Sequence, residues 1–300
     1  MGWLSHAEGT LDPEAVTIAL LGTGLLGTAI GQRFLEQGES LQGWNRHPER
    51  LAPLVALGAQ AAASAADAIA AAEVVVSVLS DGAVCRQVLI DQAGGALAGR
   101  LVINMATIAP SESQELAAAV SERGGRFLEA PVLGSRPEAL AGTLQVMAGG
   151  EPEVFKEALP LLRQLTPAPR LLGPVGAGLI TKIALNQLIA SLTHAFSLSL
   201  HLVQDSGGDV GAFMELLRGS ALYAPTFDKK LSKLLANDFA NPNFPTAHLR
   251  KDLRLFLASA RQQGLTTTGL DGLAVLLEQA AGTAIDGLDY SALHRLTAQR

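Results

Sequence analysis

A glycine-rich hexapeptide near the N-terminus is the first segment whose residue types suggest chemistry. Gly22-Thr23-Gly24-Leu25-Leu26-Gly27 has the spacing GxGxxG, follows a short apolar run and opens a helical stretch. In that context the first glycine permits a tight turn, the second lets the backbone approach a diphosphate, and the third lets helix and strand pack closely. The free N–H groups at the helix start would hold the diphosphate of a dinucleotide. An ordinary glycine turn is the less favoured interpretation.

The residues about 20 positions after these glycines indicate which dinucleotide is bound, because NAD sites usually carry an acid there that binds the adenosine ribose. This chain has Trp44-Asn45-Arg46 at that place. No carboxylate would repel a 2′-phosphate, and the guanidinium of Arg46 offers a planar set of donors suited to one. We therefore expect NADP(H) to be favoured over NAD(H), the alternative being that Arg46 is a solvated loop residue.

A lysine and an asparagine in the second half of the chain could serve a hydride transfer. Such a reaction needs a group that stabilises or protonates the carbonyl oxygen. Lys182 follows the glycine-rich segment 173–178 at the start of a very apolar helix, and Asn186, four residues on, shares its helix face. The residues alone leave two interpretations open: Lys182 is a partly desolvated catalytic lysine, or it is a structural lysine whose ammonium reaches towards the surface.

The elements that must position these residues divide the chain in two. From Val16 to about residue 148, short β-branched runs alternate with alanine-rich helical stretches, which predicts a Rossmann-type, doubly wound parallel sheet of the α/β class. The central runs are apolar throughout, as strands covered on both faces must be. The predicted strands are 16–21, 40–44, 74–79, 101–104, 127–130 and 143–149, and the predicted helices are 25–37, 111–123 and 151–164.

After the proline- and glycine-rich stretch 167–178 only helical patterns remain. The segment 179–205 is too apolar for a surface helix and should run through the core of a second domain as a long interdomain helix. Shorter helices are expected at 210–217, 227–235, 247–263 and 270–281. We predict an N-terminal extension at 1–15, an NADP-binding domain at 16–173, and an all-helical domain at 174–300 for substrate binding and dimerisation.

Composition narrows the classes of partner. With 48% hydrophobic residues, 17% charged residues and a formal net charge of −6, the chain should fold compactly and repel nucleic acid. The single cysteine, Cys85, and the lack of a secretory signal favour the cytoplasm. The sequence contains no run of about 18 uninterrupted apolar residues, so it predicts no membrane span. His194 and His201 are interpreted as packed helix residues, so no metal is expected.

Four separated blocks resemble the β-hydroxyacid dehydrogenase family, which includes 3-hydroxyisobutyrate dehydrogenase and the glyoxylate or succinic semialdehyde reductases. The blocks are ALLGTGLLGTAI with the later WNR, NMATIAPSESQEL, EAPVLGSRPEALAGTLQVMAGG, and GPVGAGLITKIALNQ with the later LRKDLRL. The resemblance implies hydride transfer between a nicotinamide and a small hydroxy acid, its oxo counterpart or a semialdehyde. Glyoxylate and succinic semialdehyde are the favoured substrates.

The resemblance also implies roles for single residues. Lys182 matches the family's proton-donating lysine, and Asn186 would bind the substrate beside it. Lys251 would close over the cofactor, Asp252 would border the substrate, and Thr107 would touch the nicotinamide ribose or the substrate. Further residues implied by position are Leu79, Ser80 and Val84 at the cofactor and Phe244 at the substrate wall.

Departures from the family pattern concern the substrate. Where the family commonly reads Pro-Val-Ser-Gly-Gly, this chain reads Pro131-Val132-Leu133-Gly134-Ser135. Leu133 removes a hydroxyl donor, while Gly134 and Ser135 would still supply backbone N–H groups to the substrate. Arg136 either binds an acidic group or points into solvent. Asn104 and Ala106 replace the usual Asp and Ser, which leaves an atypical or larger carbonyl substrate open.

Two other functions remain open at this point. An imine reductase of the same fold usually has Asp or Tyr at the lysine position, so Lys182 argues against it. A non-catalytic NADP-binding protein is conceivable because the substrate loop is altered. In each case the expected partners are a small molecule and other copies of the chain, as a homodimer or homotetramer.

Overall fold

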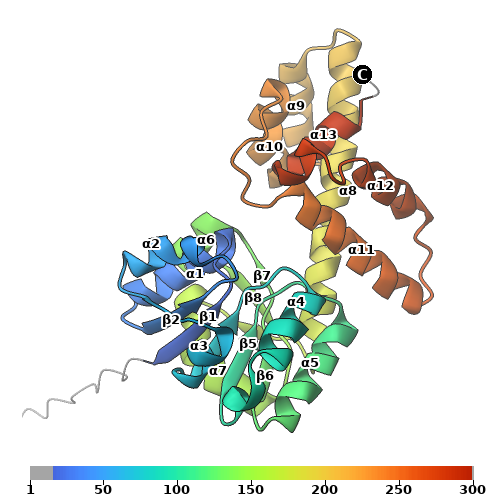
Figure 1. Ribbon diagram of the computed structural model, residues 1–300. Helices are drawn as coiled ribbons and strands as arrows, with labels where there is room; N and C mark the ends of the chain where they lie inside the picture. The colour runs from blue at the N-terminus through green and yellow to red at the C-terminus, as the bar shows by residue number, and fades with distance from the viewer. Residues whose placement is uncertain (1–15, 299–300) are drawn as a thin grey trace, which may run out of the picture.

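The computed structural model describes residues 16–298 and has two lobes joined by one long helix (Figure 1). The predicted extension at 1–15 and the last two residues lie outside the described part of the chain. The first lobe is built on a β-sheet with helices on both faces, and the second lobe is helical.

The main sheet has six parallel strands in the order β3-β2-β1-β4-β5-β6, which confirms the predicted doubly wound sheet. The strand order reverses between β1 and β4, so the carboxyl ends of these two parallel strands open the crevice where such sheets bind ligands. The apolar central strands are buried because helices cover both faces. The strands are β1 Thr17–Leu21, β2 Ser40–Trp44, β3 Gln60–Ala61, β4 Val74–Ser77, β5 Leu101–Asn104 and β6 Arg126–Glu129.

A second, small sheet differs from the prediction. The segment predicted as a strand at 143–149 forms β8 (Gln145–Ala148), which leaves the main sheet and pairs antiparallel with β7 (Val132–Leu133) and parallel with β9 (Arg170–Leu171). The strands β3, β7 and β9 were not predicted, because two residues are too few to show a hydrophobic period.

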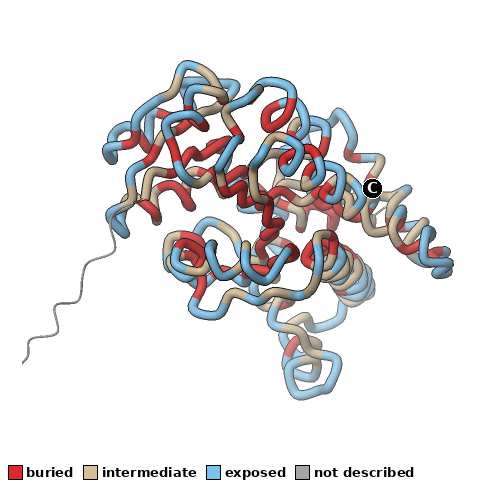
Figure 2. The backbone as a smooth tube through the Cα atoms, turned by 90° about the horizontal axis from the view of Figure 1, so that it is seen from below, coloured by how far each residue is buried: buried red, intermediate tan, exposed pale blue. Residues whose placement is uncertain are grey.

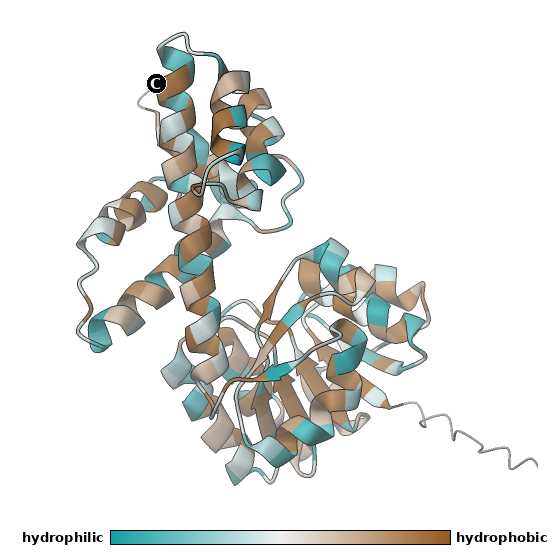
Figure 3. Ribbon diagram, turned by 180° about the vertical axis from the view of Figure 1, so that it is seen from behind, coloured by the Kyte–Doolittle hydropathy of each residue, from teal (hydrophilic) through white to brown (hydrophobic). Residues whose placement is uncertain are grey.

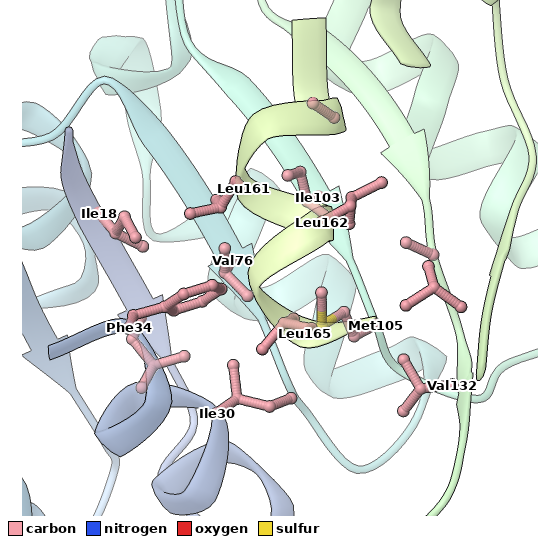
Figure 4. Packing of buried hydrophobic residues seen from close by; sticks show 14 of the residues in the cluster. Ile18, Ile30, Phe34, Val76, Ile103, Met105, Val132, Leu161, Leu162 and Leu165 are labelled. Atoms are coloured by element: carbon pink, nitrogen blue, oxygen red, sulfur yellow. The ribbon is translucent and has the colours of Figure 1, made fainter. Parts of the chain in front are cut away.

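Helices of the first lobe pack on the main sheet from both sides. Phe34 and Ile30 of α1 meet Leu161, Leu162 and Leu165 of α7 over one face, as Figure 4 shows. Helices α3 and α5 cover the other face. The tube coloured by burial in Figure 2 shows buried segments concentrated inside this lobe. The helices are α1 Leu25–Glu36, α2 Ala52–Val55, α3 Ala65–Ala70, α4 Gly82–Arg86, α5 Pro110–Glu122, α6 Arg136–Ala141 and α7 Pro152–Leu165, with 3₁₀ turns at Pro48–Leu51 and Gly94–Leu97 and a π turn at Gln87–Asp91.

The long helix α8 (Ala177–Asp205) contributes to both lobes. Leu179 packs in the first lobe, Ala190 packs with Leu249 and Leu253 of the later helix α11 (Thr246–Gln262), and Phe196 packs further along. Figure 3 shows hydrophobic residues along much of its length. Within residues 16–298 it is the one helix long and apolar enough to cross a membrane, a test that a buried core helix also passes.

The remaining helices of the second lobe follow α8. They are α9 Val210–Arg218, α10 Pro225–Ala236, α11 Thr246–Gln262, α12 Thr268–Glu278 and α13 Leu293–Leu296, with 3₁₀ turns at Ala284–Gly287 and Tyr290–Ala292. The predicted helix at 227–235 begins two residues earlier, because Pro225 suits the first helical position.

Candidate active site

The three motif glycines stand in different surroundings. A Cβ on Gly22, whose φ is +96°, would lie 2.5 Å from the Val78 carbonyl oxygen, and one on Gly27 would lie 2.0 Å from the Gly22 carbonyl oxygen. These two glycines are therefore required by the protein's own packing. A Cβ on Gly24 would meet nothing within 4 Å. The open space above Gly24, at an N-terminus of α1 that no side chain caps, fits a bound diphosphate.

The end of β2 is tied to the glycine loop. The Asn45 side chain donates to Oγ1 of the buried Thr23 at 2.9 Å, and its Oδ1 accepts from the His47 backbone N–H at 2.8 Å. Asn45 thereby fixes the turn that carries Arg46. The Arg46 side chain is exposed, and no carboxylate within residues 16–298 pairs with it. This arrangement leaves its guanidinium available to an anion.

A cavity of about 610 Å³ borders the same loop. Its lining includes Gly24, Leu25 and Thr28 of the glycine loop and α1, together with Arg50 and Arg136. Arg136, whose direction the sequence left open, thus lies beside the glycine loop. Leu26 is half-buried and packs against the core on the α1 side of the sheet.

The predicted cofactor residues after β4 lie on the other side of the glycine loop. A Leu79 methyl carbon is 3.1 Å from the place that a Gly22 Cβ would occupy. Asp81 caps α4 by accepting from the Val84 backbone N–H at 2.9 Å, and the Ser80 hydroxyl donates to the same carboxylate at 2.7 Å. Leu79, Ser80 and Val84 therefore border the carboxyl end of β4, next to the crevice.

Five residues far apart in sequence meet where the two lobes join. Lys182 Nζ donates to Asn186 Oδ1 at 2.9 Å, and Asn186 Nδ2 donates to Asp252 Oδ2 at 2.6 Å. Asp252 Oδ1 lies 2.9 Å from Lys251 Nζ, which donates to the Thr107 backbone carbonyl. The chain of contacts runs from α8 through α11 to the loop after β5, so Lys251 bridges the helical lobe and the sheet. Both polar groups of Asn186 are engaged in this chain.

Burial sets the protonation behaviour of Lys182, whose exposed fraction is 8%. Removal from water lowers its pKa to about 8, the negative charge of Asp252 opposes the shift, and the positive charge of Lys251 adds to it. A lysine with that pKa is mostly protonated at neutral pH, yet it gives up its proton far more readily than an ordinary lysine. It can therefore act as a general acid in one direction of a reaction and a general base in the other.

The loop after β6 corrects one expectation. Ser135 was expected to offer a backbone N–H to the substrate, but its N–H and its hydroxyl both donate to Glu138 Oε2, each at 2.7 Å. Partial burial raises the pKa of Glu138, but these bonds and the Lys229 ammonium outweigh it and hold the pKa below its usual value. Ser135 is thus used as the N-cap of α6. Leu133 is half-buried and Gly134 is exposed.

Other predicted or altered residues have local packing partners. Phe244 is half-buried, with its ring 5.8 Å from Tyr290 and 6.0 Å from His248. Asn104 is fully buried and accepts from the Ser77 hydroxyl at 2.8 Å, and Ala106 donates its N–H to the same oxygen at 3.4 Å. Asn104 thus joins the ends of β4 and β5 beneath the crevice. Within the described residues no group of three or more His, Cys, Asp or Glu side chains is placed to hold a metal ion.

Sequence reasoning missed a buried carboxylate. Glu129, at the end of β6, accepts hydrogen bonds from α5 and from the first turn of α8, the helix that carries Lys182. The available signal was an acid directly after the apolar residues of a predicted strand, a position that is buried in a doubly wound sheet.

Comparisons with known proteins agree with this geometry. The family model for the NAD binding domain of 6-phosphogluconate dehydrogenase matches residues 17–173, and the model for NAD-binding of NADP-dependent 3-hydroxyisobutyrate dehydrogenase matches residues 176–297. Glyoxylate/succinic semialdehyde reductase 1 of Arabidopsis thaliana is 30% identical over 92% of this chain and 96% of its own length.

Solved structures give the same picture. The 3-hydroxyisobutyrate dehydrogenase of Mycobacterium tuberculosis, with L-serine, has a TM-score of 0.84 at 26% identity, over 94% of this chain and 98% of that one. A reductive aminase of Aspergillus terreus, in complex with NADPH, cyclohexanone and allyl amine, has a TM-score of 0.64 at 25% identity, over 95% of this chain and 100% of that one. The matches across both lobes, together with the glycine loop and the buried lysine, mean that this chain is an NAD(P)-dependent oxidoreductase that belongs to the β-hydroxyacid dehydrogenase family.

Proposed function

We propose that the protein uses NADPH to reduce a small oxo acid or semialdehyde to the hydroxy acid, with Lys182 as the proton donor. The observation that carries the proposal is the buried Lys182, linked through Asn186 to Asp252 at the junction of the lobes. An ammonium in that position has lost most of its water, so it interacts strongly with an oxygen on which negative charge develops.

In this proposal each residue of the site has a separate role. When bound, the dinucleotide supplies the hydride; Gly24 and the first turn of α1 would hold its diphosphate. Lys182 Nζ gives a proton to the carbonyl oxygen in reduction and takes it back in oxidation. Asn186 orients the ammonium through its Oδ1, and Asp252 orients the Asn186 amide. Lys251 draws the helical lobe towards Thr107 and so helps to exclude water.

The preference for NADP rests on the surroundings of the β2 carboxyl end. Arg46 lacks a carboxylate partner among the described residues, and Arg50 lines the neighbouring cavity. A 2′-phosphate placed there would gain charge-assisted hydrogen bonds that the hydroxyl of NAD would not.

Glyoxylate and succinic semialdehyde are the proposed substrates, since the relative of 30% identity bears both names. The imine-reductase alternative is less well supported, because the reductive aminase has the lower TM-score of the two solved structures and Lys182 provides a proton donor suited to an alkoxide. A non-catalytic role is less well supported, because burying the Lys182 ammonium costs free energy that a cofactor-binding role alone does not require.

The test measures NADPH consumption with glyoxylate, succinic semialdehyde, methylmalonate semialdehyde and a cyclic imine, for the wild type and Lys182→Ala. We expect turnover of an oxo acid and a loss of at least about 10²-fold in kcat for the variant, the usual contribution of a general acid. NADPH affinity, measured by fluorescence, should change little. Turnover of the imine alone, or of no compound despite NADPH binding, would contradict the proposal.

A further inference from the structure

A fully buried carboxylate lies at the root of the helix that carries the proposed proton donor. Glu129, the last residue of β6, has no exposed surface. Its Oε2 accepts from the Ser113 hydroxyl of α5 at 2.7 Å, and its Oε1 accepts from the backbone N–H groups of Gly178 and Leu179 at 2.9 and 3.3 Å. The reaction as proposed makes no use of this side chain.

Glu129 supplies a cap that α8 does not have from its own sequence. The residue at the N-cap of α8 is Gly176, which has no side chain to accept a hydrogen bond. The free N–H groups of a first turn favour a negatively charged acceptor, and a carboxylate satisfies two of them here. The cap therefore joins a 29-residue helix to the sheet rather than to its own preceding loop.

The backbone around Glu129 is shaped for close contact. A Cβ on Gly149 would lie 2.3 Å from Glu129 Oε1, and a Cβ on Gly178 would lie 2.3 Å from the Met147 carbonyl oxygen. Because only glycine fits at these two positions, the first turn of α8 can lie against the backbone of β8 and the Glu129 carboxylate can reach that turn. Small shifts of the helix are therefore resisted by backbone contacts as well as by hydrogen bonds.

Lys182 lies one helical turn beyond the capped residues. A rise of about 1.5 Å per residue places its Cα only about 5 Å along the axis from Gly178 and Leu179. A displacement of the first turn would consequently move Lys182 by nearly the same amount. Its contact with Asn186 would not prevent this, since both residues belong to the same helix.

We propose that Glu129 is a positioning residue for hydride transfer: by fixing the first turn of α8 to the sheet, it sets where the Lys182 ammonium stands relative to the crevice. Its role in catalysis rests on the function proposed above for Lys182. The carboxylate itself acts only through the helix backbone, at a distance from the reacting atoms.

The kinetic test compares Glu129→Ala with Glu129→Gln. The Gln carbonyl can still accept from Gly178 and Leu179 while its amide donates to Ser113, so the cap survives without the charge. Because misplacement by about 1 Å can cost about 10²-fold, we expect Glu129→Ala to lose about 10- to 100-fold in kcat and Glu129→Gln to stay within about threefold. The dissociation constant of NADPH should stay within about twofold for both variants, since the glycine loop is untouched.

Two further variants make this comparison specific. Glu157→Gln is the matched control and should leave kcat unchanged. Glu157 of α7 forms an exposed ion pair with Arg126, which lies on the same strand as Glu129. If Glu129→Ala does not fold, Glu129→Asp replaces it, since the shorter acid withdraws from the first turn and should lower kcat by the same mechanism. A kcat within twofold of the wild type in the cap-removing variant, at a temperature well below its melting point, would overturn the proposal.

A second readout does not depend on turnover. Reductive ¹³C-methylation followed by NMR titration gives the pKa of Lys182, whose resonance is assigned by its loss in Lys182→Arg. The charged groups that face Lys182 are Asp252 and Lys251, both on α11. In Glu129→Ala the first turn is released, so the pKa of Lys182 should rise from about 8 towards that of an exposed lysine. In Glu129→Gln, which keeps the cap, the pKa should stay at its wild-type value. An unchanged Lys182 pKa in Glu129→Ala would contradict the positioning role. If the pKa rises as expected but the wild-type protein reduces no oxo acid, only the proposed function is contradicted.

Discussion

At the scale of single residues, the main feature of the site is a lysine that is buried and whose pKa is low enough for it to release a proton. Among residues 16–298 the Lys182 ammonium donates to the side-chain oxygen of Asn186, and the negative charge that acts on it is that of Asp252, one residue further along the chain of contacts. A direct ion pair with a carboxylate would raise the lysine's pKa and oppose proton release. The intervening amide orients the ammonium while it limits that effect, which suits a group that must give and take a proton.

Arg46 is the residue on which cofactor choice should depend. We expect Arg46→Ala to weaken NADPH binding about tenfold or more, since a charge-assisted bond is worth roughly 1.5–3 kcal/mol, and to leave NADH binding unchanged. Fluorescence titration with both cofactors checks this. Arg163→Ala, on the exposed surface of α7, serves as the control. Equal weakening for NADPH and NADH would place Arg46 away from the 2′-phosphate.

The sequence was informative about residues whose chemistry is local. The glycine spacing and the missing acid after β2 could be recognised directly, and Lys182 with Asn186 followed from helical spacing. The contact of Asn186 with Asp252, 66 residues away, could not be derived from spacing, because it depends on how α11 packs on α8. The engagement of Ser135 by Glu138 was missed although a Ser three residues before a Glu is a capping-box signature.

At the scale of elements, the glycine loop separates packing from ligand binding. Gly24 has φ −72° and a Cβ there would meet open space, whereas a Cβ on Gly27 would collide with the backbone of Gly22. We expect Gly24→Ala to keep its melting temperature and to bind NADPH about tenfold or more weakly, because a methyl group would occupy the place of the diphosphate. Gly27→Ala should instead melt roughly 5–10 °C lower, since its Cβ has no room.

Thermal unfolding and NADPH titration of the two glycine variants check this contrast. Unchanged NADPH affinity in Gly24→Ala would mean that the diphosphate does not lie over Gly24. A stable Gly27→Ala would mean that helix and strand can separate without cost.

Element prediction succeeded where both faces of a strand or one wide face of a helix are buried. Strands β1, β4 and β5 and helix α8 were found for that reason. The two-residue strands β3, β7 and β9 have no periodic pattern, and the separate sheet that β8 joins was not predicted, because a single strand's sequence does not identify its neighbour. The position of β8 matters here, since Met147 of β8 is what the first turn of α8 lies against.

At the scale of the whole molecule, two lobes share one helix, and we propose that they divide at residues 173–174. Contacts that cross the division include Glu129 with the start of α8, Lys251 with the Thr107 carbonyl, and Lys229 with Glu138 at 3.7 Å. They connect the end of β6, the loop after β5 and α6 to the helical lobe. Motion between the lobes would therefore alter the site directly, as expected for an enzyme that closes over its substrate.

The helical lobe also exposes large apolar side chains. Leu202, Leu216 and Leu222 have exposed fractions of 71%, 76% and 78%. We predict that they contribute to a self-association surface, so sedimentation equilibrium should give two or four times the 31.1 kDa of one chain. Leu216→Ser should weaken the assembly, and Leu57→Ser, an exposed leucine of the other lobe, should not. A single species of one chain's mass at micromolar concentration would contradict this prediction.

The most direct test of the central claim is the pH dependence of kcat for an accepted oxo acid and its hydroxy acid, measured in both directions. Lys182, with its pKa lowered to about 8, must carry the proton to reduce and must lack it to oxidise. We predict that the rate of reduction falls, and the rate of oxidation rises, as the pH increases through about 8, and that both limbs disappear in the residual activity of Lys182→Ala. Rates that move in the same direction, or limbs that persist without the lysine, would contradict the account.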